Sequence, residues 1–401
     1  MKRTKRVLLL LVLLGLLIPG IMFAQSPQVV RIAFTDPPTL NVGEISIFHP
    51  SMAAMLAFKG AFERYTNNRF VVELYPFGVL GDAGSNLEQM LVGTLEGGTP
   101  AEGALAPFFP NIQVLSIPYI FSNALVLYDV LDGPFGQRMF EDMARTAGLR
   151  VLAAFDNGGF RHFTNSRHPI RSAEDMRGLR IRTMDIPIHM EMVRSLGASP
   201  TPIAFLELYG ALQTGVVDGQ ENSAITILGA SLNEVQRYVV LDGHLLGMAF
   251  LTFSERWFQS LSPADQEAAR KAGREAAIAA RGVVRFGESL AIEQLRVRGM
   301  EVHTPTESEM ATFREATQEP AIRWLRENVD TALVDELITL VAEGDVGRGS
   351  PPGIVHIQAG FTAPAAAPAG QGGGGNTVLF VVIALISGLA VGFVISRVKK
   401  A

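Results

Sequence analysis

Two arginines stand where a guanidinium could hold the carboxylate of a small ligand. Arg182 directly follows residues 179–181, an apolar segment typical of a strand. A guanidinium fixed there can donate two parallel hydrogen bonds to a carboxylate, which makes the contact strong and directional. Arg161 follows Gly158 and Gly159, which let the backbone approach a ligand closely. The alternatives are that Arg182 belongs to a structural ion pair and that Arg161 is a solvated surface residue.

The remaining polar residues give little support for catalysis. The seven histidines include no His-Glu-x-x-His spacing, and His162 and His168 lie six residues apart across a predicted turn, a poor geometry for a metal. No Gly-x-Ser-x-Gly motif occurs. The chain has no cysteine, which excludes disulfides, thiolate metal sites and a cysteine nucleophile. We therefore predict a protein that is not an enzyme, holds no metal and needs no cofactor.

Length and composition favour a two-lobed α/β protein. The chain has 401 residues, of which 48% are hydrophobic and 18% charged, more than a single domain usually holds. The net charge is −5 and the pI about 5.9. Because nucleic-acid binding requires a clustered basic face, we predict no nucleic-acid partner.

Hydrophobic periodicity predicts the elements that must position these residues. An alternation of strands and helices continues to about residue 340 and indicates mostly parallel sheets. We expect a loop at 37–50 and short buried strands and turns at 104–119. The predicted strands are 29–34, 70–75 and 150–155, and the predicted helices include 51–65, a segment from 83 to about 92, and 125–148.

The N-terminus predicts an export signal over residues 1–24. Four cations within residues 2–6 precede an apolar run, 7–18, and then Pro19 and Gly20. This order is typical of a secretory signal peptide, with cleavage plausible after Ala24. The alternative is an uncleaved anchor.

The C-terminus predicts a membrane tether. Residues 377–396 contain no charged residue, and a segment of this length is long enough to cross a bilayer as a helix. Three cations follow this segment at once. Since positive residues stay cytoplasmic, the body is expected outside, periplasmic and tethered to the inner membrane. Residues 342–376 are predicted to be a flexible linker, because 363–376 are mainly Ala, Pro and Gly.

Residues 156–244 carry the most specific pattern. They include GGFRHFTNS at 158–166, DMRGLRIRT at 175–183, LGASPTP at 196–202 and ALQTGVVDGQEN at 211–222. In order and spacing these motifs resemble those of the periplasmic binding subunit of tripartite ATP-independent periplasmic (TRAP) transporters, the dicarboxylate-binding DctP-like family. The resemblance extends over roughly residues 30–340.

The resemblance implies a set of ligand-binding residues. Arg182 matches the family's carboxylate clamp, Arg161 a second basic contact, and Asn222 a contact through its side-chain amide. Phe205 is expected to form an apolar wall of the pocket, and Glu102 aligns with an acidic residue near the ligand in some members. The corresponding alternatives are a turn residue for Asn222, a core phenylalanine for Phe205 and a surface glutamate for Glu102. Asp218 and Glu221 are expected to be residues of the fold.

Three features depart from the family pattern. Family members usually have proline where Ser223 stands, and the segment 36–50 is longer than usual, which puts ligand contacts from the first lobe in doubt. A C-terminal membrane span is not a usual feature of the family and suggests a tethered binding protein.

The resulting prediction is a periplasmic-binding-protein fold with hinge strands and a ligand cleft between two lobes. Residues 29–157 and 248–287 form the first lobe, and 158–247 and 288–341 the second. Arg161, Arg182 and Asn222 hold a small carboxylate, the first lobe closes over it, and the loaded protein docks on TRAP membrane subunits. The alternative function is a membrane-tethered sensor or scavenger of organic acids.

Removal of the residues from Thr377 onward tests the tether. We expect the truncated protein to be released as soluble protein with unchanged ligand affinity, because the binding body lies before the linker. Membrane fractionation measures this, and a truncated protein that stays with the membrane would instead identify the N-terminus as an anchor.

Overall fold

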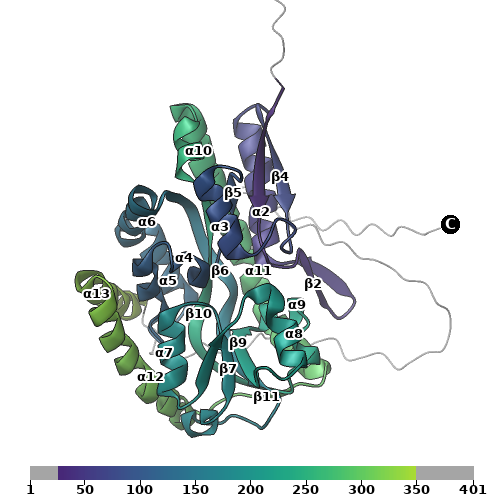
Figure 1. Cartoon of the computed structure of the whole chain (residues 1–401), viewed down its shortest axis with the longest axis vertical. Helices are drawn as coiled ribbons and strands as arrows, with labels where there is room; N and C mark the ends of the chain where they lie inside the picture. The colour runs from purple at the N-terminus through teal and green to yellow at the C-terminus, as the bar shows by residue number, and fades with distance from the viewer. Residues whose placement is uncertain (1–25, 349–401) are drawn as a thin grey trace, which may run out of the picture.

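The computed structural model describes residues 26–348 as an α/β protein of two lobes joined by long strands (Figure 1). A nine-stranded sheet runs through both lobes in the order β4-β1-β5-β10-β6-β9-β7-β8, and β11 pairs with β10. The chain folds as the two-lobed α/β architecture predicted from the sequence.

The first lobe surrounds three parallel strands. β1 pairs in parallel with β4 and with β5, and the second half of β10 pairs with β5 in the antiparallel sense. One face of this sheet packs against α2 and α11, and the other against α3, α5 and α6. The strands and helices of this region are β1 (Gln28–Ala33), α2 (Pro50–Tyr65), β4 (Phe70–Tyr75), α3 (Ala83–Val92), β5 (Gly97–Gly98), α4 (Glu102–Leu105), the 3-10 helix η1 (Pro110–Ser116), α5 (Ala124–Asp132), α6 (Pro134–Ala147) and α10 (Glu255–Ser260).

The second lobe has the same layered build. β7 pairs in parallel with β8 and β9, and β9 pairs with the second half of β6. One apolar cluster joins α8 and α9 to this sheet, and another joins α7 and α12 to the opposite face. Its elements are η2 (Ala173–Met176), β7 (Arg180–Thr183), α7 (Pro187–Ser195), β8 (Ser199–Pro202), η3 (Phe205–Glu207), α8 (Leu208–Gln213), β9 (Gly219–Ser223), α9 (Ala224–Gly229), η4 (Leu232–Glu234), β11 (Glu301–His303) and α12 (Glu307–Asn328).

Two strands and one helix connect the lobes. β6 (Leu149–Asn165) and β10 (Tyr238–Ser254) are each 17 residues long and pair with each other in both lobes. Register shifts interrupt this ladder between Val240 and Leu245 and between Leu246 and Met248. The 35-residue helix α11 (Pro263–Val297) packs on α2 of the first lobe and on α9 of the second. Figure 1 shows these three elements side by side between the lobes. The irregular stretch of the ladder is the natural place for the lobes to bend.

Glycines make the bend in β6 possible. Gly158 and Gly159 have φ values of +106° and +92°. A Cβ on Gly158 would lie 2.3 Å from the Ser223 hydroxyl, and one on Gly159 would lie 2.3 Å from the Glu288 carboxylate. Both the backbone conformation and the close packing therefore require glycine at this point.

The segment that was predicted as a loop, 37–50, contains a β-hairpin. β2 (Thr39–Val42) pairs with antiparallel β3 (Ile45–Phe48) through a tight turn that begins at Gly43, where φ is +61°. Leu40 is buried in the apolar cluster of the second lobe. The hairpin also bonds to the C-terminal half of α11: Gly43 N donates to Gln294 Oε1 at 3.0 Å, and Arg298 Nη2 donates to the Asn41 carbonyl at 3.0 Å. An early segment of the chain thus reaches across to the second lobe.

Other predicted elements meet mixed outcomes. The strands at 29–34 and 70–75 and the helix at 51–65 are confirmed within one residue. The helix predicted at 125–148 is divided into α5 and α6, because Pro134 cannot continue the first helix. The prediction of short strands at 104–119 was wrong, since this segment forms the end of α4 and η1.

The C-terminal helices return to the first lobe. The apolar cluster around α5 and α6 also contains Leu325 of α12 and Val334, Leu337 and Val341 of α13 (Thr331–Arg348). The sequence analysis placed all of 288–341 in the second lobe. Leu295 and Phe313 do pack there, whereas the end of α12 and α13 pack in the first lobe. α13 also continues to Arg348, so the residues just after 342 are helical and not linker.

The predicted terminal segments lie outside the described residues. These are the signal peptide 1–24, the linker beyond residue 348 and the membrane span 377–396. Within residues 26–348, every helix is too short or too polar to cross a membrane.

Gly158→Ala tests the glycine requirement in the hinge. We expect the free energy of unfolding to fall by about 1–3 kcal/mol, because alanine combines an unfavourable φ with a clash against Ser223. Gly210→Ala is the matched control, since nothing lies within 4 Å of a Cβ at that position in α8. Urea denaturation compares the two, and equal stability of both variants would contradict this account.

Candidate functional site

Arg182 is a buried cation without an anionic partner in the described part of the chain. Only 2% of its surface is exposed, and its Nε donates to the Ile203 carbonyl at 2.8 Å. Among residues 26–348, neither of its two terminal nitrogens forms a hydrogen bond or an ion pair with protein. Burial lowers the pKa of Arg182 to about 10, with Glu221 opposing and Arg161 adding to this effect. The side chain therefore stays charged at neutral pH. The alternative that Arg182 belongs to a structural ion pair was wrong.

The position of Arg182 follows from its strand. It stands next to the end of β7, where the parallel strands β7 and β9 place Arg182 beside Gln220. The carboxyl ends of parallel strands are the usual place for ligands in open α/β sheets. β7 is held by Asp218, whose carboxylate accepts from the backbone and guanidinium of Arg180. Asp218 is therefore a residue of the fold, as expected.

Arg161 is also buried, but it forms an ion pair. Its Nη2 donates to Glu221 Oε1 and to the Glu221 carbonyl, each at 2.8 Å, and its Nε contacts Glu221 Oε2. The alternative of a solvated surface arginine was wrong. Burial lowers the pKa of Arg161, but Glu221, Glu102 and Asp36 raise it more, so that it stands above the usual value. Of these three acids, Glu221 is the one in direct contact with the Arg161 guanidinium.

Glu221 joins Arg161 to a second buried cation, His244. His244 Nε2 lies 3.3 Å from Glu221 Oε2, and its Nδ1 lies 2.7 Å from Asp242 Oδ2. Burial lowers the pKa of His244, but the charge of Asp242 and hydrogen bonds to both acids raise it to about 9. Burial raises the pKa of Glu221, but Arg161 and His244 lower it well below its usual value. Arg161, Glu221, His244 and Asp242 form a connected charged network.

Asn222 lies in the middle of β9 and not in a turn. It stands opposite His162 in β6, and its Nδ2 donates to Gln220 Oε1 at 2.6 Å. Because side chains alternate across a strand, Gln220 and Asn222 share a face with Arg182, while Glu221 points to the other face. β7 and β9 thus place the unpaired guanidinium and the Asn222 amide on one side of the sheet.

Ser223, the departure from the family's proline, caps the next helix. Its hydroxyl accepts from Thr226 N at 3.3 Å and donates to the Asn157 carbonyl at 3.3 Å. Asn157 is next to the hinge glycines, so Ser223 ties the start of α9 to the bend in β6.

Glu102 belongs to the first lobe and is buried, so the alternative of a surface glutamate was wrong. It begins α4, only 1% of its surface is exposed, and its Oε2 accepts from Met248 N at 3.3 Å. Burial raises the pKa of Glu102 to about 7, although Arg161 lowers it. Its Oε1 has no hydrogen-bond partner among the described residues.

Phe205 is half-buried at the start of η3 and packs against the apolar cluster that includes Leu208 and Ile225. It stands two residues after Ile203, whose carbonyl holds Arg182. This placement fits both the pocket wall and the core alternative.

The sequence analysis did not single out several polar residues near this network. Thr183 follows Arg182, and its buried hydroxyl has no partner among the described residues. His189 is fully buried in α7 with both ring nitrogens unpaired, and its Nδ1 lies 3.8 Å from Glu221 Oε1. Burial lowers the pKa of His189 to about 3. Thr183 ends the motif at 175–183 but was not itself singled out, and no motif marks His189, whose position depends on how α7 packs on the sheet.

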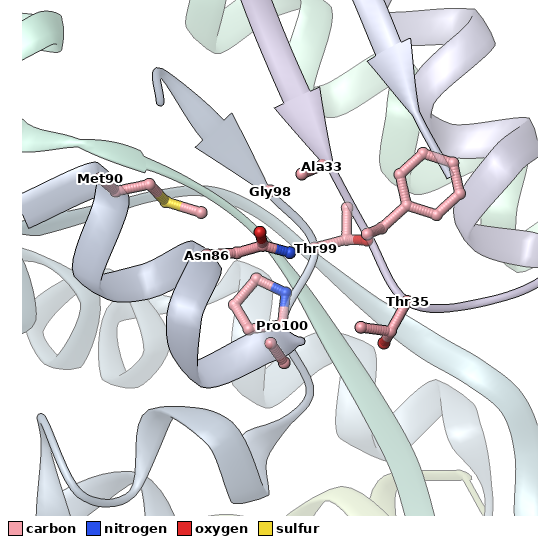
Figure 2. Close-up of a pocket in the computed structure, with 9 residues that line it drawn as sticks. Ala33, Thr35, Asn86, Met90, Gly98, Thr99 and Pro100 are labelled. Atoms are coloured by element: carbon pink, nitrogen blue, oxygen red, sulfur yellow. The ribbon is translucent and has the colours of Figure 1, made fainter. Parts of the chain in front are cut away.

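A small cavity lies on the first-lobe side (Figure 2). Its volume is about 10 Å³, room for about one water-sized sphere. Thr35, Asn86, Thr99 and Pro100 line it, together with Ala33, Phe34, Ala83, Met90 and Gly98. The cavity therefore forms where β1 and β5 end. One of its lining residues, Thr99, stands three residues before Glu102 in the chain.

No group of three or more His, Asp or Glu side chains within residues 26–348 is arranged to hold a metal ion. The charged groups of the site are instead arranged around guanidinium and carboxylate pairs.

The pH dependence of stability tests the charged network. The pKa of His244 is higher in the folded protein, about 9, than its ordinary value of 6.5. Protonated His244 therefore stabilises the fold fully below pH 6.5, and this contribution is lost as pH rises through 9. We expect the difference in unfolding free energy between wild type and His244→Gln to shrink by about 3 kcal/mol over that range.

Urea denaturation at several pH values measures this difference. His168→Gln, at an exposed position, is the control and should follow the wild-type profile. A difference between wild type and His244→Gln that stays constant from pH 6 to 9.5 would contradict the proposed protonation of His244.

Comparison with known proteins assigns the chain to one family. The model of the DctP family, described as bacterial extracellular solute-binding protein, family 7, matches residues 44–326. The sialic acid-binding periplasmic protein of Vibrio cholerae is 30% identical over 288 residues, which cover 72% of this chain and 87% of that protein.

Two solved structures have the same fold. A TRAP periplasmic solute-binding protein from a Polaromonas species, bound to D-erythronate, is 31% identical with a TM-score of 0.71, and the match covers 78% of this chain and 98% of that one. The sugar acid binding protein of Advenella mimigardefordensis, in complex with galactonate, is 26% identical with a TM-score of 0.74, over 79% of this chain and 99% of that one. The chain belongs to the DctP family of bacterial extracellular solute-binding proteins, the periplasmic binding proteins of TRAP transporters.

Proposed function

We propose that this protein captures a small organic acid between its two lobes, with Arg182 as the group that binds the carboxylate. The observation that carries the proposal is the buried Arg182 guanidinium, which has no acid to pair with among residues 26–348. A buried charge is costly unless it is paired, and a ligand carboxylate would provide the missing partner.

Contrast with the other buried arginines supports this role. Arg161 pairs with Glu221, and Arg150 of β6 pairs with Glu141 and Glu255. Because their charges are already balanced inside the protein, neither needs a ligand anion. Arg182 differs from both, although it is equally enclosed.

The neighbouring groups complete the proposed site. Asn222 is on the same side of the sheet as Arg182, and its amide would bond a ligand oxygen. Arg161 pairs with Glu221 on the other face of β9, so we propose it only as a secondary contact, through its Nη1, which has no protein partner among the described residues. Phe205 would provide an apolar wall, and Glu102 would face the ligand from the first lobe.

Binding would proceed by closure of the lobes about the bend in β6 and β10. Closure excludes water and thereby strengthens the interaction between Arg182 and the carboxylate. The relatives described above bind sialic acid, D-erythronate or galactonate, all of which carry a carboxylate. By analogy, we propose that the closed and loaded protein delivers its acid to TRAP membrane subunits from a periplasmic position, tethered by the segment 377–396.

Paired methionine variants test the role of Arg182. Arg182→Met should weaken the binding of organic acids by about 2–5 kcal/mol, because it removes the charged hydrogen bonds to the carboxylate. The same change should leave the ligand-free protein as stable as the wild type, or more stable, because it removes an unpaired buried charge.

Arg161→Met is the matched comparison. It leaves Glu221 without its closest cation, so we expect the free energy of unfolding to fall by about 3 kcal/mol. A thermal-shift screen of organic acids finds the ligand, and calorimetry and urea denaturation measure the two effects. Less than a twofold loss of affinity in Arg182→Met would contradict the proposed function.

A further inference from the structure

We infer that Gly103 of the first lobe is the residue that lets the two lobes close fully beside Arg182, because it leaves room for Met184 of the second lobe. Gly103 is thus a positioning residue, which acts through the approach of the lobes and not through contact with a ligand. The inference rests on the proposed function, in which Arg182 holds a carboxylate and the first lobe shuts over it. It adds the contact that sets how closely the lobes approach.

The space beside Gly103 is filled by the other lobe. Gly103 is buried in α4, and a Cβ at this position would lie 2.6 Å from Met184 Cβ and 2.9 Å from Met184 Sδ. Met184 directly follows β7 of the second lobe and packs against the apolar cluster of the first. Since carbon atoms in contact stay about 3.5–4.0 Å apart, a methyl group on residue 103 would push the two segments apart by about 1 Å. The nearest atom is Met184 Cβ, which the backbone fixes, so a change of side-chain rotamer does not relieve the clash.

The backbone gives no reason for glycine at position 103. Gly103 lacks the positive φ of Gly158 and Gly159. It lies inside a helix, where alanine is the better helix former. The glycine is therefore explained by space alone, and the space is occupied by a residue of the second lobe.

A segment of the second lobe crosses to the first lobe at this point. Ile186 and Ile188, which follow Met184, are fully buried in the apolar cluster around α5 and α6. Ile188 N donates to Gln113 Oε1 of η1 at 3.2 Å. The lobes therefore meet directly after the strand that carries Arg182.

A second close approach between the lobes lies at η3. A Cβ on Gly78, in the loop after β4, would lie 2.5 Å from Leu206 Cδ1. Leu206 stands three residues after Ile203, whose carbonyl accepts from Arg182. This contact is softer, because Leu206 is 42% exposed and its methyl groups can move. The lobes thus approach each other at two places near Arg182, of which the one at Gly103 is rigid.

A displacement at Gly103 matters for binding because the proposed ligand groups are its neighbours. Glu102 precedes Gly103, and Arg182 stands two residues before Met184. Binding groups must be held within about 0.5 Å of their productive positions, and a separation of about 1 Å exceeds that tolerance. Gly103→Ala would therefore hold the first lobe away from an acid on Arg182 and leave the open form unaffected.

Calorimetry on Gly103→Ala tests the inference. The probes are pyruvate, L-lactate, succinate, D-gluconate and L-glutamate, and the comparison uses the acid that the wild type binds most tightly. Gly103→Ala should bind it at least about fivefold more weakly, because the closed form is overpacked. Without acid, the free energy of unfolding should equal or exceed that of the wild type, because the open form leaves the new methyl group free. Gly60→Ala in α2, with nothing within 4 Å of its Cβ, is the control and should retain wild-type affinity.

Met184→Gly shows whether the effect acts through the second lobe. This change removes the atoms that a methyl group on residue 103 would meet. In the Met184→Gly background, Gly103→Ala should therefore weaken binding by less than about twofold. A local effect of alanine on α4 would instead persist in both backgrounds.

The outcomes separate this inference from the proposed function. A smaller loss of affinity in Gly103→Ala than expected overturns the inference, and so does a larger loss than expected in the Met184→Gly background. A fall in the unfolding free energy of acid-free Gly103→Ala also overturns it, because the contact would then persist in the open form. In these cases the carboxylate role of Arg182 still stands. Failure of all five acids to bind the wild type overturns the proposed function and the inference with it.

Discussion

A single unpaired charge organises the functional part of this protein. The Arg182 guanidinium is enclosed by the fold, bonded only to the Ile203 carbonyl among the described residues, and still protonated at neutral pH. The surrounding charges are balanced among themselves through Arg161, Glu221, His244 and Asp242. The folded protein thus bears the energetic cost of one buried cation, which the carboxylate of the proposed ligand would offset.

The proposed ligand groups are carried by strands of the second lobe and by segments next to the connection between the lobes. β7 and β9 carry Arg182 and Asn222, while β6 carries Arg161 two residues after Gly159. Glu102 comes from the first lobe but bonds to Met248, which lies where β10 loses its regular register. Two of the proposed ligand groups, Arg161 and Glu102, are therefore attached to the irregular stretch of β6 and β10 about which the lobes would bend. Binding and movement are coupled through the covalent chain itself.

The sequence predicted the fold class, because it depends on local patterns, and it singled out Arg182 and Asn222, whose roles as ligand contacts stay predictions. Strand and helix periodicity defined β1, α2 and β4, and the ordered phrases between residues 156 and 244 identified Arg182 and Asn222. Three features escaped prediction because they depend on distant contacts. The hairpin at 39–48 is stabilised by the second lobe, α13 by α5, and the burial of Glu102 by β10. The pairing of Arg161 with Glu221 also needs the β6–β9 register, which no motif gives.

The hairpin has a consequence for affinity. Besides β6, β10 and α11, it provides a further tie between the lobes, since Leu40 is embedded beside α9 and Gly43 and Asn41 bond to the far end of α11. Lobes tied at several separated points keep little rotational freedom apart from one bending direction. In the proposed function, less conformational entropy would then be lost when the ligand fixes the closed arrangement, so more of the interaction energy at Arg182 would appear as affinity. In this way the β2–β3 hairpin would contribute to preorganisation of the binding protein.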